Sequence, residues 1–100
     1  MISVNTDKEF LITILEETIS NNNAVTILKD LKNAVSIKPD KKIIIDLAKV
    51  KYLDSAGIAM LVNFVQFMEG SQKKMSLINL TSKVKDTIKV LNLNKFFNLE

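Results

Sequence analysis

The chain contains no histidine and no cysteine among its 100 residues, and it has only two glycines and one proline. Without histidine and cysteine, Ser-His-Asp or Cys-His nucleophilic catalysis, Cys/His zinc sites and disulfides are all excluded. Two glycines are too few for a phosphate-binding P-loop or a dinucleotide-binding motif. We therefore expect a protein without a metal, a cofactor or an enzymatic activity of its own.

Arginine is also absent, because all 14 basic residues are lysines, and the formal net charge is +3. Lysine carries a point charge and cannot form the bidentate forks with which arginine recognises bases and phosphates. The lysines are scattered singly or in pairs along the chain, and we interpret them as solvated residues that precede strands. We expect no direct contact with nucleic acid.

Hydrophobic residues make up 47% of the chain, but no apolar run approaches 20 residues. This composition favours one globular domain over residues 1–100 and argues against a membrane span. The first ten residues lack the basic region and apolar stretch of a secretory signal. We expect a cytoplasmic location, with the protein present as a monomer or a weak dimer.

Runs of β-branched and apolar residues predict the strands, which turn residues separate. The run around Ile43 has no alternation, which is typical of a central strand that is buried on both faces. The predicted extended segments are Ile2–Val4, Phe10–Leu15, Ile43–Leu47, Val50–Leu53, Met75–Leu80 and a last edge strand over Phe96–Leu99.

Apolar residues at helical spacing predict three helices between these strands. The run Asn21–Asn23 supplies a cap for the first helix, Gly70 is a natural residue to end the second, and Ser82 caps the third. The first helix has apolar residues repeating from Ala24 to Val35 and should end before Pro39, and the second should run from about Ser55 to Glu69. The third should follow Ser82 and is marked by Val84, Ile88 and Leu91.

This order of elements predicts an α/β fold, in which helices pack on a mixed sheet of four to five strands. Ile43–Leu47 should be an interior strand parallel to Met75–Leu80, and the helix Ser55–Glu69 should connect them in a right-handed crossover. Functional residues of such folds gather where a strand ends and the next helix begins.

The junction with distinctive chemistry is Tyr52–Gly57, with the sequence Tyr-Leu-Asp-Ser-Ala-Gly. Asp54 is placed to cap the helix, and Ser55 falls in its first turn, where free N–H groups and the helix dipole favour an anion. A phosphate on Ser55 would be accommodated there. The alternative is a tight strand-to-helix turn, in which Gly57 only allows close packing.

The helix after this junction has a wider apolar arc than a one-sided contact with a sheet requires, with a narrow polar arc around Ala59. Either the helix is packed between the sheet and another helix, or it presents one margin to a partner. That margin would be Met60 with Phe67, or Ile58 with Val62. Methionine suits a binding surface because it adapts to different partners.

Two other chemistries have less support from the sequence. Asp7, Asp46 and Asp54 could form an acidic magnesium cluster, but Asp46 lies inside an apolar run and Asp7 in a turn. A Ser-Lys hydrolase could use Ser55 with Lys51, but no glycine-rich oxyanion loop accompanies them.

Beyond these patterns, the chain resembles a known family. Lys42–Leu47, the spacer Ala48–Lys51 and Tyr52–Leu61 resemble the core of the STAS domain, the fold of the bacterial anti-sigma factor antagonists. The stretch Ile78–Phe97 is similar to that family's closing strand, helix and edge strand. The resemblance extends from about Ile12 to Phe97.

In this family the serine directly after the aspartate is the regulatory phosphoacceptor, and it maps onto Ser55. The resemblance implies a regulator of transcription that, when unmodified, binds an anti-sigma factor that is also a serine kinase. Phosphorylation would then end the interaction. The candidate contact residues are Ile58, Met60, Phe67 and Ser20.

The chain departs from the family's Gly-Glu-Leu-Asp-like turn at Glu17–Ser20, where Ser20 stands in place of the aspartate. In the family that aspartate lies near the phosphoacceptor, so the change bears on recognition by the kinase. The alternative function is therefore a constitutive STAS interaction subunit, in a transport ATPase or a signalling complex. In that case Ser55 is only structural.

Overall fold

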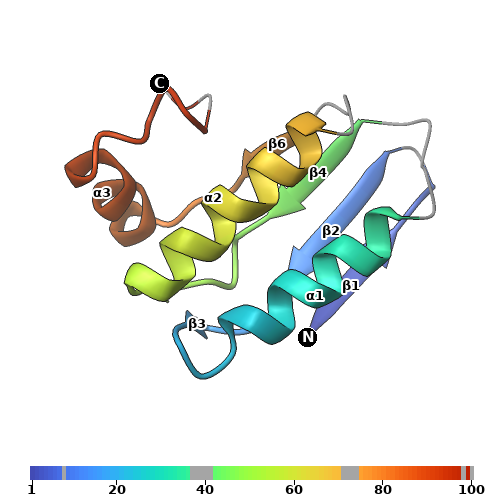
Figure 1. Cartoon of the computed structure of the whole chain (residues 1–100), viewed down its shortest axis with the longest axis horizontal. Helices are drawn as coiled ribbons and strands as arrows, with labels where there is room; N and C mark the ends of the chain where they lie inside the picture. Colours follow the sequence, from blue (N-terminus) through green and yellow to red (C-terminus); the bar gives the residue numbers. More distant parts are fainter. Residues whose placement is uncertain (8, 37–41, 71–74, 98, 100) are drawn as a thin grey trace.

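The computed structural model describes residues 1–7, 9–36, 42–70, 75–97 and 99. Three strands precede the first helix, two precede the second and one precedes the third (Figure 1). In chain order they are β1 (Ile2–Asn5), β2 (Phe10–Ile14), β3 (Thr18–Ile19), α1 (Ala24–Val35), β4 (Ile43–Asp46), β5 (Tyr52–Leu53), α2 (Ser55–Gly70), β6 (Met75–Ile78) and α3 (Ser82–Val90).

The main sheet has four strands in the order β1-β2-β4-β6. β1 and β2 form an antiparallel hairpin, whereas β4 runs parallel to both of its neighbours, β2 and β6. The predicted mixed sheet is confirmed, as are the interior position of β4 and its parallel pairing with β6. α2 lies between these two strands in the chain; the hand of the connection stays a prediction.

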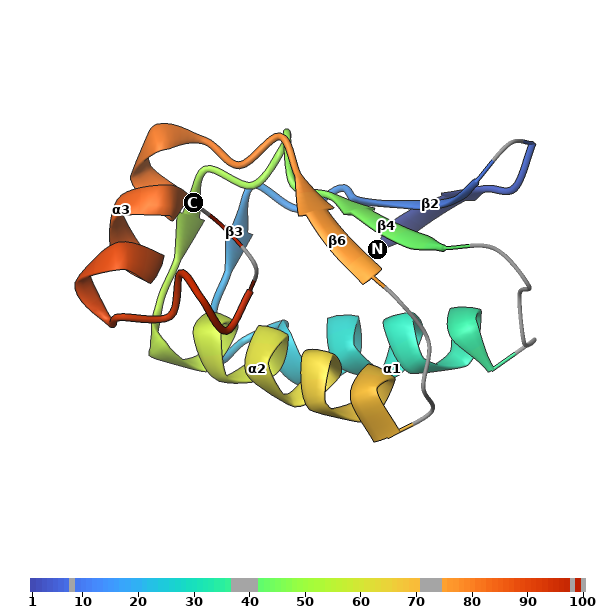
Figure 2. The ribbon, with the colours of Figure 1, turned by 90° about the horizontal axis from the view of Figure 1, so that it is seen from above.

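Helices α1 and α2 lie side by side against one face of this sheet (Figure 2). Alternate residues of β4 point toward them, so that Ile43 and Ile45 are fully buried while Ile44 and Asp46 are half-buried. The prediction that this strand is buried on both faces is wrong. A continuous aliphatic run arises here because Ile44 pairs with Leu11 of β2 on the face opposite the helices.

A second, two-stranded parallel sheet forms from β3 and β5, in which Thr18 pairs with Tyr52 and Ile19 with Leu53. The backbone carbonyl of Glu17 accepts hydrogen bonds from the amides of Lys51 and Tyr52, at 2.7 and 3.2 Å. The sequence did not predict β3. Its pairing brings the segment after β2 beside the start of α2.

Two predicted helix ends differ from the structure by a residue. Gly70 lies within α2 and does not have a positive φ, so it is not the left-handed residue that ends the helix. The N-cap of α3 is Thr81, whose hydroxyl accepts from the amide of Val84 at 3.3 Å, and Ser82 is the first helical residue.

The predicted edge strand at the end of the chain is wrong for the residues that the structure describes there. Positions 94–97 form turns, and the amide of Phe97 donates to the carbonyl of Leu93 at 3.0 Å. Phe97 is buried and meets Phe96 edge-on, with ring centroids 5.2 Å apart. The apolar run therefore fills the core and adds no strand to the sheet; Asn98 lies outside the described residues.

Within the described ranges, none of the helices combines the length and the apolar character that crossing a membrane requires.

Candidate functional site

The candidate site is the junction between β5 and α2, where Asp54 lies between the last strand residue and the first helical residue. The Asp54 carboxylate accepts a hydrogen bond from the amide of Gly57 at 3.0 Å, and its carbonyl accepts from Ile58 at 3.0 Å. Asp54 is therefore the N-cap of α2, as the sequence predicts. Its cap places Ser55 at the exposed first position of the helix.

Gly57 lies against the backbone of β3. A Cβ atom at this position would lie 2.6 Å from the carbonyl oxygen of Ile19 and 3.2 Å from its Cβ atom. That same carbonyl accepts a hydrogen bond from the amide of Asp54 at 3.2 Å. Because Gly57 has no side chain, α2 can begin directly against the end of β3.

Ser20 follows directly after the pair Ile19–Leu53, so the register of β3 and β5 brings it beside Asp54. Its position is held by Asn23, whose side-chain oxygen accepts from the Ser20 amide at 2.9 Å and whose side-chain nitrogen donates to the Thr18 carbonyl at 2.8 Å. Asn23 therefore holds the end of β3. The sequence predicted that the asparagine run caps α1, but the Asn23 side chain makes no capping hydrogen bond.

The amides of Ser55 and Ala56 are the first two of α2, and neither can bond within the helix. In the part of the chain that the structure describes, neither of these two amides has an acceptor. They lie at the positive end of a 16-residue helix, where a negative group is stabilised. The Asp54 carboxylate next to them already supplies part of that negative charge.

Two further side chains border the junction, and the sequence did not single them out. Tyr52 is 45% exposed, and the ammonium group of Lys83 lies 5.2 Å from the centroid of its ring. α3 packs against β5, and the Thr81 hydroxyl donates to the carbonyl of Val50 at 3.3 Å. The available signal was a tyrosine two residues before the cap. Its partner Lys83 is 31 positions away, and no local pattern connects the two residues.

The predicted contact residues on α2 divide into two groups. Ile58 and Met60 are only 6% and 4% exposed, so the prediction that they form a surface margin is wrong. α2 packs against α1 and β5, and these two side chains belong to the common core. Phe67 is 39% exposed, and the Lys32 ammonium lies 5.1 Å from its ring centroid.

The alternative chemistries find no support in this geometry. Asp46 accepts from the amide of Ala48 at 2.9 Å and from the side chain of Asn79 at 3.3 Å, so it holds the end of β4. Across the described ranges, acidic residues do not gather in threes close enough to bind a metal ion. The Lys51 ammonium pairs with Glu17 at 3.8 Å, on the surface.

Comparison with known proteins gives one family and several structures. The family model of the STAS domain matches residues 1–100. An anti-sigma factor antagonist from Mycobacterium paratuberculosis has a TM-score of 0.82 at 20% identity. The match covers 99% of this chain and 83% of the antagonist. The unphosphorylated anti-sigma factor antagonist SpoIIAA has a TM-score of 0.73 at 15% identity, covering 95% and 82% of the two chains. The phosphorylated Bacillus SpoIIAA has a TM-score of 0.68 at 14% identity, covering 95% and 85%.

Part of an anion transporter has the same fold. The murine anion transporter Solute Carrier 26 family member A9 has a TM-score of 0.76 at 16% identity, over 86% of this chain and only 14% of the transporter. At these identities the structural likeness establishes the fold alone.

Proposed function

Because this chain belongs to the STAS domain family, we propose that it is an anti-sigma factor antagonist that a phosphate on Ser55 switches off. Unmodified, it binds an anti-sigma factor with serine-kinase activity; phosphorylated, it releases that partner. The observation that carries the proposal is the exposed Ser55 at the first position of α2, directly after the Asp54 cap. The protein would act on transcription through its partner, in the bacterial cytoplasm, and would not be an enzyme itself.

The fold is suited to accept the modification. A phosphate adds about −1.5 to −2 charges, and the amides of Ser55 and Ala56 are available to it at the positive end of α2. The Asp54 carboxylate is a like charge beside it, but that carboxylate is held by the Gly57 amide and need not move. We therefore expect the phosphorylated protein to keep its fold.

We expect the phosphate to weaken the binding of the partner. A strongly hydrated phosphate in a contact surface must either meet a cation or lose its water without compensation. In the second case the partner binds the phosphorylated protein more weakly than the unmodified protein. A loss of about 1.4 kcal/mol already weakens binding tenfold, and a larger loss abolishes a micromolar complex.

The test is to incubate the protein with its co-purifying kinase and ATP, to map the modified residue by mass spectrometry, and to titrate variants against that partner. Ser55→Asp should fold normally and bind at least about tenfold more weakly. Ser55→Ala should bind like the native protein but no longer be switched off. Ser82→Asp is the matched control, because Ser82 is also the exposed first residue of a helix.

Two further residues belong to the proposed contact surface. Phe67→Ala should weaken the complex, whereas Val90→Ala, which changes a more exposed apolar residue on α3, should not. Ser20 lies beside Asp54, in the position that the resemblance assigns to an aspartate. If the kinase reads that position, Ser20→Asp should speed phosphorylation of Ser55; an unchanged rate would remove Ser20 from the recognition surface.

A second function is favoured by the serine at position 20 and by the likeness to a domain within an anion transporter. In that case the chain is a constitutive STAS interaction subunit of a transport or signalling complex. Ser55 would then remain unmodified, and Ser55→Asp would bind the co-purified partner as tightly as the native protein.

A further inference from the structure

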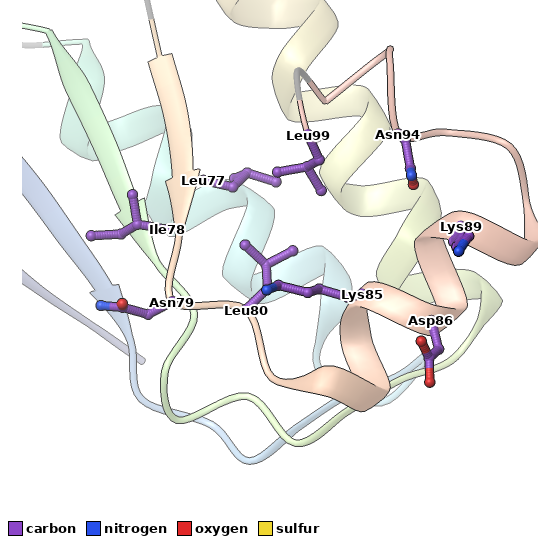
Figure 3. A pocket seen from close by; sticks show the side chains of 9 residues that line it. All are labelled: Leu77, Ile78, Asn79, Leu80, Lys85, Asp86, Lys89, Asn94 and Leu99. Carbon is purple, nitrogen blue, oxygen red and sulfur yellow. The ribbon is translucent and has the colours of Figure 1, made fainter.

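A cavity of about 720 Å³ lies between the end of β6, one side of α3 and the residues that follow α3 (Figure 3). It does not include the junction at Ser55. Volumes of this size are typical of small-molecule sites. The residues that line it are Leu77, Ile78, Asn79, Leu80, Lys85, Asp86, Lys89, Asn94 and Leu99.

One wall of the cavity is aliphatic. Leu77 is buried, and in Figure 3 its side chain points across the cavity toward Leu99, with Leu80 below them. Leu80 and Leu99 are only partly covered by the rest of the protein. A ligand in the cavity would therefore remove apolar surface from water, which is worth roughly 25 cal/mol per Å².

The opposite wall is cationic. Lys85 and Lys89 are one helical turn apart on the exposed side of α3, and both line the cavity. Figure 3 shows the Lys85 side chain extending toward Leu80, whereas the Asp86 carboxylate points away from the leucines. Lysine stems lie along apolar surface while their ammonium groups stay in water, which places a positive rim over an apolar floor.

We propose that this cavity binds an amphiphilic anion, with its aliphatic chain against Leu77, Leu80 and Leu99 and its carboxylate or phosphate head against Lys85 and Lys89. None of the described residues that line the cavity is aromatic. Stacking on aromatic rings is the usual way to hold a nucleobase, so the lining favours an aliphatic body over a nucleotide. Asn94 adds an amide group that can bond to the head.

Decanoate is the probe, added as monomers to isotopically labelled native protein and followed by amide chemical shifts. We expect saturable shifts at the amides of residues 77–80 and 85–89. Inorganic phosphate, which has no chain, and decanol, which has no charge, should each bind much more weakly. Vesicles of phosphatidylglycerol distinguish a free anion from a membrane surface: binding to vesicles without competition from decanoate would overturn the proposal.

Substitutions on the exposed side of α3 do not change the core, and together with Leu99→Ala they test the cationic wall and the aliphatic wall separately. Exposed ion pairs are weak, so removing both with Lys85→Gln and Lys89→Gln should weaken decanoate binding by about two- to thirtyfold, and Asp86→Asn should strengthen it modestly. Lys83→Gln is the matched control, because Lys83 lies over Tyr52 and does not line the cavity. Leu99→Ala should weaken decanoate binding as well.

Besides the vesicle result, three results would overturn the proposal: no saturable binding of decanoate, shifts confined to other parts of the protein, or equal affinity of the native protein and the double lysine variant. The outcome does not depend on the proposed switch, because none of these residues lies in the Ser55 junction.

Discussion

Replacing Gly57 by alanine is the most direct test of how the junction is built. In most helices this change stabilises, because alanine has a better helix propensity than glycine by about 0.5–1 kcal/mol. At Gly57 the added Cβ atom would lie 2.6 Å from the backbone carbonyl oxygen of Ile19, a distance that real Cβ contacts do not show. Either α2 or β3 must therefore move.

The cost follows from what the movement disturbs. Ile19 is fully buried, and overpacking a core typically costs about 1–3 kcal/mol. Displacing the Ile19 carbonyl also weakens its hydrogen bond with the Asp54 amide, which contributes on the order of 1 kcal/mol. After the helix-propensity gain is subtracted, we expect Gly57→Ala to lower the free energy of unfolding by about 1–3 kcal/mol.

Urea denaturation monitored by circular dichroism measures this free energy. Gly70→Ala is the control in the same helix, because an added Cβ there meets no atom within 4 Å and the φ angle is not positive. We expect Gly70→Ala to be neutral or stabilising. If Gly57→Ala proved as stable as Gly70→Ala, the close approach of α2 and β3 would not constrain the junction and the reasoning would be refuted.

Three other substitutions test the hydrogen bonds around the junction, those at Asp54 and Thr81 by the same denaturation assay and that at Asn23 by hydrogen exchange. Asp54→Ala removes the cap of α2 and should cost about 1 kcal/mol, most of which Asp54→Asn should recover, since asparagine caps equally well. Asn23→Ala removes both bonds that brace β3, so hydrogen exchange at the Ser20 amide should become faster while a distant amide in β2 stays protected. Thr81→Ala removes the cap of α3 and its bond to Val50 and should cost about 1 kcal/mol, whereas Thr81→Ser should not.

The long elements could be predicted because each carries its own periodic signal. Apolar residues repeat at helical spacing from Ala24 to Val35, and α1 spans these residues and ends before Pro39, as predicted. The aliphatic run at Ile43 predicted an interior strand, and β4 has parallel strands on both sides. Asp54 was predictable as a cap because the residue type and its place before an apolar helix both indicate one.

The elements that the sequence missed depend on distant partners. β3 has two residues, and it is a strand only because β5, which is 34 positions away, provides the pairing. The sequence correctly indicated a wide apolar arc on α2, but periodicity does not say which margin is covered. In the structure Ile58 and Met60 are both buried in the common core. Phe97 could not be distinguished from a strand residue, because a buried turn and a buried strand need the same apolar side chain.

These constraints indicate how a phosphate on Ser55 would act. The Gly57 amide is occupied by the Asp54 carboxylate and the Ile58 amide by the Asp54 carbonyl, while the Asp54 amide donates to the carbonyl of Ile19 in β3. Only the first two amides of α2 are available to bind a phosphate on Ser55. We therefore expect the phosphate to bind there with little rearrangement of the backbone. The switch that we propose must therefore be read by the partner, as a change in the charge and hydration of a surface whose shape stays the same.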